Sequence, residues 1–329
     1  MKTKYLFLIY ILCTGLLKAQ DMHFTQFYAA PMYLNPAFAG SNVCSRASLI
    51  YRNQWPGIHT AYKTYMFSAD HHIAKSPMNA GLAVASDVAG SASLRTTLIY
   101  PTVAYETYLN RTYSIRLGVQ PGIGMQSINY EKFLFGSEIV SGVGDKIENP
   151  IRSTAYFDAN AGLLLHSERA YIGASFFHLN RPNESLMGAT SKLPIKYSIH
   201  GGYTYNMSGK SKDILEYKEL NVVFHYRGQR KFSQLDLGVY YNQYIFTVGF
   251  WYRGLPIVKS YAPGYSNNDA VAFLVGYKKD RISIGYSYDL TISRLYKSTS
   301  GAHELSLSYQ YCPPAKKIKP RRRVACAKF

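Results

Sequence analysis

The sequence predicts an all-β protein: a transmembrane antiparallel β-barrel of about 14 strands, with a short segment before it and a basic tail after it. Three observations predict this fold class. Apolar and polar residues alternate with period two in fourteen stretches, the chain begins with an export signal, and 31 tyrosines outnumber 16 phenylalanines and 2 tryptophans. Strands with one apolar face, and aromatic rings with a polar tip at the membrane–water interface, are typical of outer-membrane barrels.

The export signal is expected at residues 1–19. Met1–Lys4 is basic, Tyr5–Leu17 is apolar, and Ala19 ends a signal-peptidase site before Gln20. The apolar stretch is too short for a membrane-spanning helix, and no later run of eighteen apolar residues follows. We therefore expect an exported protein of the outer membrane that crosses it with strands.

Residues 20–42 interrupt the strand pattern. This stretch is apolar and contains Pro31 and Pro36, and residues that precede proline favour extended or turn geometry. It is too apolar for a free tail and too short for a core of its own. We expect it to plug or cap the barrel from the periplasmic side.

Residues 43–311 carry the alternating pattern. Leu305 and Leu307, for example, alternate with Ser306. Charged and amide side chains on the polar faces suit a barrel lumen better than a sandwich core, where their burial is unfavourable. The expected strands are 43–54, 61–73, 78–88, 93–108, 112–127, 156–167, 170–179, 196–206, 219–227, 233–241, 244–253, 268–278, 281–289 and 302–311.

The connections between these strands alternate in length. Four of the seven odd-numbered connections are long, and five of the six even-numbered ones are short. Long loops outside and tight turns in the periplasm are the arrangement of outer-membrane barrels. An even number of strands then places both termini in the periplasm, and closure brings the first strand beside the last.

Three cysteines follow the signal peptide, and an exported protein can oxidise them. Cys312 and Cys326 enclose a short loop and are the preferred disulfide. Closure of the barrel makes Cys44–Cys312 the alternative. No histidine or cysteine pair has zinc-like spacing, so no metal or cofactor is expected.

Much of the net charge of +18 lies in the tail, residues 312–329, which we expect in the periplasm. Segregated in this way, it does not indicate nucleic acid as a partner. The tail is either a solvated end or a docking site for an acidic periplasmic partner or the headgroups of outer-membrane lipid. The candidate docking residues are Lys316, Lys317, Lys319, Arg321, Arg322 and Arg323.

The inward-facing residues offer no expected catalytic site. His71, His72, His200 and His225 are not spaced with serines as nucleophilic catalysis requires. Charged residues of both signs are expected to pair inside the barrel: Glu106, Arg111, Arg116, Asp158, Asp236 and Asp289.

Several motifs resemble the PorP/SprF family, outer-membrane proteins of the type IX secretion system of Bacteroidota. They are Phe24-Thr25-Gln26-Phe27-Tyr28, Ala30-Pro31, Tyr33-Leu34-Asn35-Pro36-Ala37, Gly40, Tyr51-Arg52-Asn53-Gln54-Trp55-Pro56, Gly285-Tyr286-Ser287-Tyr288-Asp289 and His303-Glu304-Leu305-Ser306-Leu307-Ser308-Tyr309. The resemblance covers the whole mature chain and includes a cysteine-bearing basic tail.

The resemblance implies a barrel that supports secretion or surface attachment of proteins with a C-terminal sorting domain, gliding adhesins among them. It implies periplasmic ring components of that machine and a cognate exported protein as partners, and it carries no catalytic residues. The motif residues are candidate partner contacts: Phe24, Gln26, Tyr28, Pro31, Leu34, Asn35, Pro36, Arg52, Asn53, Gln54, Trp55 and Pro56.

Three alternatives stay open. The stretch 53–57 is either a partner contact or a tight turn with an interfacial tryptophan. The barrel alone would also fit a passive porin or solute transporter. A soluble tyrosine-rich β-sandwich is the third alternative.

Overall fold

The computed structural model describes residues 21–58, 62–74, 76–90, 93–129, 153–186, 188–208, 217–255, 260–262, 265–293 and 296–312. The signal peptide expected at residues 1–19 and the basic tail expected after Cys312 lie outside these residues.

The predicted fold class is confirmed, because fourteen strands close into one barrel. Each coincides with one predicted strand. The wall strands are β1 (Ser45–Gln54), β2 (Tyr62–His72), β3 (Met78–Ala89), β4 (Leu94–Tyr108), β5 (Ser114–Ser127), β6 (Ser153–His166), β7 (Ala170–Phe177), β8 (Lys196–Asn206), β9 (Lys218–Gln229), β10 (Phe232–Gln243), β11 (Phe246–Gly254), β14 (Asn268–Lys279), β15 (Ile282–Thr291) and β16 (Ala302–Tyr311). β12 (Ser260–Ala262) and β13 (Tyr265–Ser266) form a small separate sheet.

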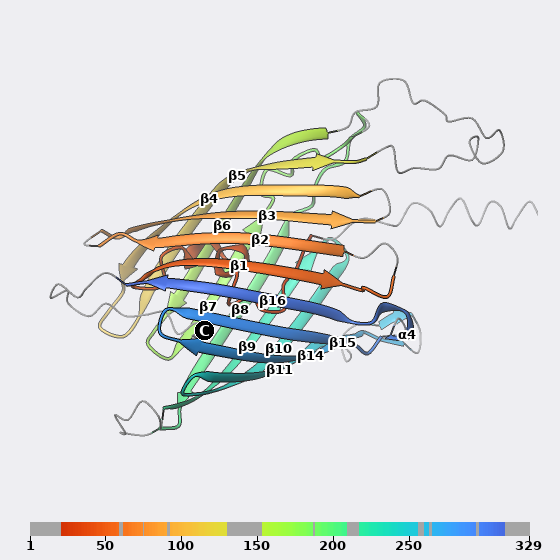
Figure 1. Ribbon diagram of the computed structural model, residues 1–329. Helices are drawn as coiled ribbons and strands as arrows, with labels where there is room; N and C mark the ends of the chain where they lie inside the picture. The colour runs from red at the N-terminus through yellow and green to blue at the C-terminus, as the bar shows by residue number, and fades with distance from the viewer. Residues whose placement is uncertain are drawn as a thin grey trace, which may run out of the picture.

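The barrel closes where β1 pairs with β16 in antiparallel register, with Leu49 opposite Leu307 (Figure 1). The connections after β1, β3, β5, β7, β9, β11 and β15 lie at one end, on the right in Figure 1. They include the longest, 128–152 and 178–195, so we call this the long-loop end. The short-turn end carries two of the three two-residue connections between described wall strands, 244–245 and 280–281, and the third, 230–231, lies at the long-loop end.

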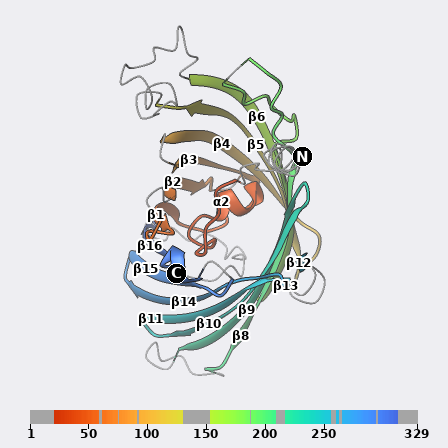
Figure 2. The ribbon, with the colours of Figure 1, turned by 90° about the vertical axis from the view of Figure 1, so that its right-hand side faces the viewer.

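The helices of the structure are short. α2 (Pro31–Leu34) and η2 (Pro36–Phe38) precede the barrel in sequence, and α4 (Tyr296–Thr299) lies in the last connection. No helix among the described residues is long and apolar enough to span a membrane. Figure 2 shows α2 inside the ring of strands. We call Asp21–Gly40 the lumenal segment.

The prediction that residues 20–42 lie on the short-turn side is wrong for the start of this stretch. Asp21 pairs with Lys196, the first residue of β8, and therefore lies at the long-loop end. Gly40 donates its N–H to Asp70, near the short-turn end of β2. β1 starts at the short-turn end. The chain before it therefore passes through the barrel interior from the long-loop end to reach β1, and the interior covers its apolar side chains.

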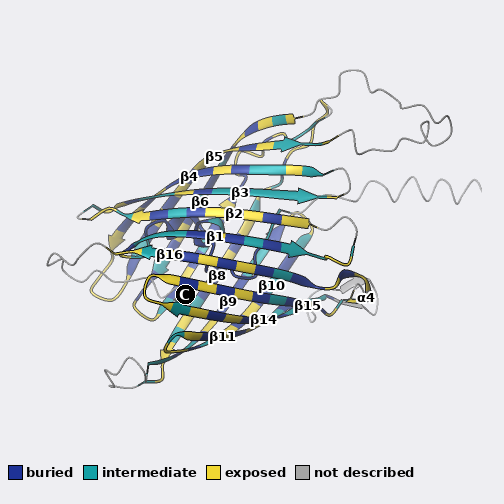
Figure 3. Ribbon diagram, in the orientation of Figure 1, coloured by how far each residue is buried: buried dark blue, intermediate teal, exposed yellow. Residues whose placement is uncertain are grey.

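Burial alternates along the wall strands, as the period-two pattern predicts (Figure 3). In β16, Leu305 is 49% exposed and Glu304 is 1% exposed. Exposed tyrosines gather near the short-turn end: Tyr108, Tyr113, Tyr203, Tyr205, Tyr244, Tyr277 and Tyr311. An apolar outer band with aromatic side chains at its edge suits a bilayer and its interface.

Candidate functional site: the segment inside the barrel

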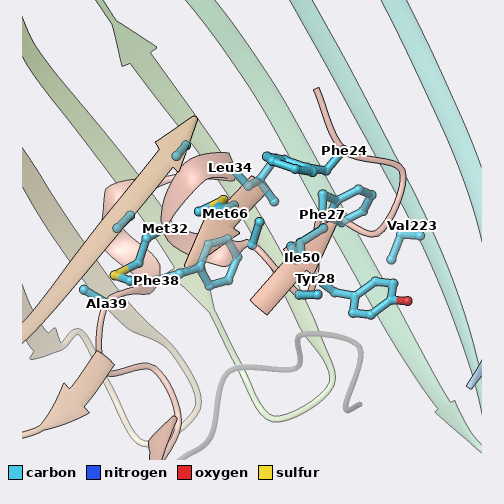
Figure 4. Close-up of a cluster of buried hydrophobic side chains, with 14 of the residues drawn as sticks. Phe24, Phe27, Tyr28, Met32, Leu34, Phe38, Ala39, Ile50, Met66 and Val223 are labelled. Atoms are coloured by element: carbon cyan, nitrogen blue, oxygen red, sulfur yellow. The ribbon is translucent and has the colours of Figure 1, made fainter. Parts of the chain in front are cut away.

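Aromatic side chains of the lumenal segment pack against the inner face of the wall (Figure 4). The Phe27 ring lies edge-on to Trp251, with ring centres 4.9 Å apart, and Tyr28 lies edge-on to Tyr240 at 5.4 Å. Full burial of one such side chain contributes roughly 1.5–3 kcal/mol. Release of the segment would therefore expose a substantial apolar surface.

Two paired glycines form the seat for η2. Gly118 of β5 lies opposite Gly162 of β6. A Cβ atom at Gly118 would lie 2.2 Å from the backbone nitrogen of Ala37, and one at Gly162 would lie 1.9 Å from Oδ1 of Asn35. Real carbon atoms do not approach so closely, so only glycine lets the segment reach the wall at this place.

Asn35 joins this seat to three strands. Its side-chain nitrogen donates to the carbonyl oxygens of Leu163 on β6 (2.9 Å) and Ala174 on β7 (3.1 Å). The same nitrogen lies 3.3 Å from Nε2 of His200 on β8. Its oxygen accepts from the N–H of Ala37 and so caps η2. Asn35 is fully buried, and each of these contacts is internal.

Arg116 of β5 binds the backbone of the same region. Its Nε donates to the carbonyl oxygen of Ala37 (2.8 Å), and Nη2 donates to that of Ala39. Nη1 pairs with Glu106 at 2.7 Å, and His166 contacts the other oxygen of that carboxylate. A buried arginine with a carboxylate partner and carbonyl acceptors has its donors satisfied and its charge compensated.

Carboxylates hold the beginning of the segment. The carboxylate of Glu304 on β16 accepts the backbone N–H groups of Thr25 (2.9 Å) and Gln26 (2.7 Å). The Thr25 hydroxyl donates to Asp289 on β15. Arg52 of β1 pairs with both acids, at 2.8 Å to Asp289 and 2.9 Å to Glu304. Arg253 adds a second cation at 3.1 Å from Asp289.

Asp21 lies in a cluster of charges at the long-loop end. Its Oδ2 lies 2.8 Å from Nε2 of His178 and 2.9 Å from Nζ of Lys196. Burial by itself would raise the pKa of Asp21, but Lys196 and His178 hold it well below its usual range. Burial would lower the pKa of His178, but Asp21 and Asp158 raise it to about 9. Both groups are therefore charged at neutral pH.

Two small cavities flank the start of the segment. One, of about 50 Å³, lies toward β8–β10 and is lined by His23, Phe27 and Arg227 among others. The second, of about 80 Å³, lies toward β2–β6 and is lined by Tyr62, Asp87 and Glu184 among others. These volumes hold a few water molecules, since one water needs roughly 10–15 Å³ by this kind of measure.

A disulfide joins Cys44, just before β1, to Cys312, just after β16. The Cα atoms are 4.4 Å apart, because the closing strands place them side by side. The preferred pair Cys312–Cys326 is therefore wrong, since a sulfur forms one disulfide, and the alternative pair is the one that forms.

The structure separates the candidate contact residues into two groups. Asn53, Gln54 and Trp55 are half-buried and Pro56 is exposed, at the long-loop end. Trp55 donates its N–H to Gly301 and contacts the ring of Tyr62 at 5.8 Å. The others are buried against the barrel and cannot touch a partner in this state: Phe24, Gln26, Tyr28, Pro31, Leu34, Asn35, Pro36 and Arg52.

The predicted pairing of interior charges is confirmed for Glu106, Arg116, Asp158, Asp236 and Asp289. It is wrong for Arg111, which is exposed in the connection after β4. The prediction missed Glu304, Arg253 and Lys196. The first two occupy inward positions of their strands, so the strand pattern could have indicated them.

The four histidines named from the sequence make other contacts in the structure. His71 hydrogen-bonds Ser45, His72 hydrogen-bonds Asn79, and His200 and His225 are buried among aromatic rings of the interior. Within the described ranges, no group of three or more His, Cys, Asp or Glu side chains could hold a metal ion.

A closed antiparallel barrel with an apolar exterior and a charged, paired interior is an outer-membrane barrel. The model of the PorP/SprF family, described as type IX secretion system membrane protein PorP/SprF, matches residues 16–309. The chain belongs to this family. Neither the family nor the fold is that of a known enzyme class.

Solved structures that resemble the chain are distant barrels. The CymD monoaromatic hydrocarbon channel is 11% identical, with a TM-score of 0.49, and the match covers 91% of this chain and 95% of that one. The Pseudomonas putida toluene transporter TodX is 10% identical (TM-score 0.44; 88% and 94% covered). Omp33 of Acinetobacter baumannii is 7% identical, with a TM-score of 0.45, and the match covers 82% of this chain and 99% of that one. No curated protein matches the chain.

Proposed function

We propose that this protein is the outer-membrane barrel of a type IX secretion machine and supports secretion or surface attachment of proteins with a C-terminal sorting domain. Gliding adhesins are the class of cargo that we propose for it. Its proposed partners are periplasmic ring components and one cognate exported protein, and we assign it no catalytic role. Family membership over residues 16–309 is the observation that supports this proposal.

The filled lumen supports this function over a passive porin or solute transporter. Most residues of the lumenal segment are buried, in both its first and its second ten residues. The two cavities beside it are small enough for water alone. A diffusion pore needs a continuous water-filled path through the barrel. In planar bilayers we expect the purified protein to show no stable large conductance. A large, ion-selective open pore would favour the porin instead.

Connection lengths support an orientation with the long-loop end outside the cell. In that orientation Cys312 and the basic tail face the periplasm, and the exposed Pro56 faces the surface. We propose that the tail docks on an acidic ring component, and that the hairpin at residues 53–56 contacts the exported protein.

Loss of the protein from its native host tests the function. We expect sorting-domain proteins to disappear from the cell surface and medium while a porin marker and membrane integrity are unchanged. The wild-type chain restores them on re-expression. Unchanged surface display of every sorting-domain protein would contradict the function.

Deletion of residues 313–329 tests the docking. We expect the deleted chain to assemble as a heat-modifiable barrel and to lose co-purification of ring components from native membranes. The charge-preserving control is the full-length chain with Arg321→Lys, Arg322→Lys and Arg323→Lys. Ring components that co-purify equally with the deleted chain would contradict docking through the tail.

A further inference from the structure

The lumenal segment begins at the long-loop end of the barrel and ends at the short-turn end. At the long-loop end, Asp21 contacts His178, which follows β7, and Lys196, which begins β8. Gln229, the last residue of β9, donates to the other carboxylate oxygen of Asp21 at 3.2 Å. Strands β7 to β9 therefore place Asp21 at one rim.

Several later residues of the segment contact deeper wall positions. Thr25 and Gln26 bind Glu304, the third residue of β16 from the long-loop end. Asn35 binds Leu163 and Ala174, farther along β6 and β7. The path is not a steady descent, because the Tyr33 ring lies 5.9 Å from that of Phe177 and its hydroxyl accepts from Lys196, both at the long-loop end.

The last residues of the segment reach the opposite rim. Arg116, the third residue of β5 from the short-turn end, binds the carbonyl oxygens of Ala37 and Ala39. Gly40 binds Asp70, and Cys44 is bonded there to Cys312. Asp21 and Cys312 thus lie at opposite ends of the barrel.

We propose that the mature N-terminal end, which precedes Asp21, is displayed on the outer surface of the cell, while the C-terminal tail stays in the periplasm. This proposal rests on the orientation given under the proposed function. The two ends of the mature chain then lie on opposite faces of the membrane, which distinguishes this chain from barrels whose two termini share the periplasmic side.

Three tagged chains test the proposal. One epitope is inserted between Gln20 and Asp21, one within the connection 128–152, and one after Phe329. Intact and permeabilised cells are labelled with antibody, and heat-modifiable migration verifies each barrel. We expect the first two tags to be labelled equally on intact cells, and the third only after permeabilisation.

The tag in the connection separates the two ways of failing. If it is labelled on intact cells and the tag before Asp21 is not, the proposal is overturned and the orientation survives. If only the tag after Phe329 is labelled on intact cells, the orientation is wrong and the proposal is overturned as well.

A smaller probe covers the case in which a tag prevents assembly. A short insertion with one cysteine between Gln20 and Asp21 is labelled with a membrane-impermeant maleimide, and Met207→Cys, in a short-turn-end connection, is the control. We expect the insertion to be labelled on intact cells and the control only after permeabilisation. The reverse pattern overturns the proposal.

Discussion

The two halves of the lumenal segment are held by different chemistry. In residues 21–30 the aromatic packing of Phe27 and Tyr28 is joined by charged contacts to segment side chains. Asp21 binds a lysine and a histidine, and the Thr25 hydroxyl binds Asp289. In residues 31–40 the wall binds backbone atoms of the segment, through Arg116, Asp70 and the side chain of Ser175. Glycines of the wall shape the seat for that second half.

The two halves of the lumenal segment therefore depend on different properties of the molecule. Contacts to backbone atoms and a glycine seat depend on the path of the chain, which Pro31, Asn35 and Pro36 hold in place. Contacts through titratable groups depend on pH and ionic strength as well. We therefore expect the second half to be the firmer anchor, and the first half, where the segment itself supplies the charge of Asp21, to loosen first when solution conditions change.

Arg116→Leu should have the largest effect. It removes both backbone anchors and leaves Glu106 buried beside His166, and breaking a buried pair in this way costs about 3–5 kcal/mol. Urea unfolding in detergent would measure the loss, and hydrogen exchange should show protection lost first in residues 31–40. Arg111→Leu makes the same chemical change at an exposed position and should alter neither the urea unfolding nor the hydrogen exchange. Equal loss of protection in both halves would contradict the division.

Alkaline pH should loosen the first half. Because the pKa of His178 is raised from 6.5 to about 9, its stabilisation is fully present below pH 6.5 and is lost as the pH rises through 9. The full contribution is on the order of 3 kcal/mol. Hydrogen exchange of residues 21–30, corrected for its intrinsic pH dependence, should rise through this interval. His178→Gln should abolish the step, and a step that persists in that variant would assign it to another group.

Gly118→Ala should strain the seat of η2. The added methyl group meets backbone atoms of Pro36 and Ala37 that a rotamer change cannot move, and overpacking of this kind costs about 1–3 kcal/mol. The midpoint of urea unfolding should fall, with exchange faster in residues 31–40. Val119→Leu, on the outward face of the same strand, is the control. An unchanged midpoint in Gly118→Ala would show that the segment does not rest on this strand.

Lys196→Gln should have the smallest effect. It removes one of two cationic partners of Asp21 while His178 remains, so we expect a loss of about 1 kcal/mol. Exchange should rise in residues 21–30 and near Tyr33, whose hydroxyl accepts from Lys196. Lys192→Gln, at an exposed position of the connection before β8, should leave exchange unchanged. A larger loss than in Arg116→Leu would reverse the order of the two halves.

The wall could be predicted from the sequence because its signal is local. A strand of ten residues such as β16 shows its two faces in its own letters, and all fourteen were found in this way. The path of the lumenal segment could not be predicted from the sequence. Gly118 faces inward by strand parity, but its partner Ala37 lies far away in sequence, and nothing in either stretch indicates the other.

The disulfide shows the same limit. A short loop between Cys312 and Cys326 is the favourable choice when only sequence distance is considered, because closing a short loop loses less chain entropy. Barrel closure brings Cys44 to Cys312 across 268 positions of sequence, and that proximity is a property of the whole molecule.

The Cys44–Cys312 disulfide also creates a short covalent path between the two ends of the barrel. It closes residues 44–312 into a covalent ring, and the chain before Cys44 passes through the barrel that this ring builds. A pulling force applied at Asp21 would reach Cys312 along residues 21–44 and one sulfur bridge. The contacts of residues 21–40 with the wall would carry such a force first. Once they gave way, the covalent chain would carry the tension between the two faces of the membrane without unzipping a strand.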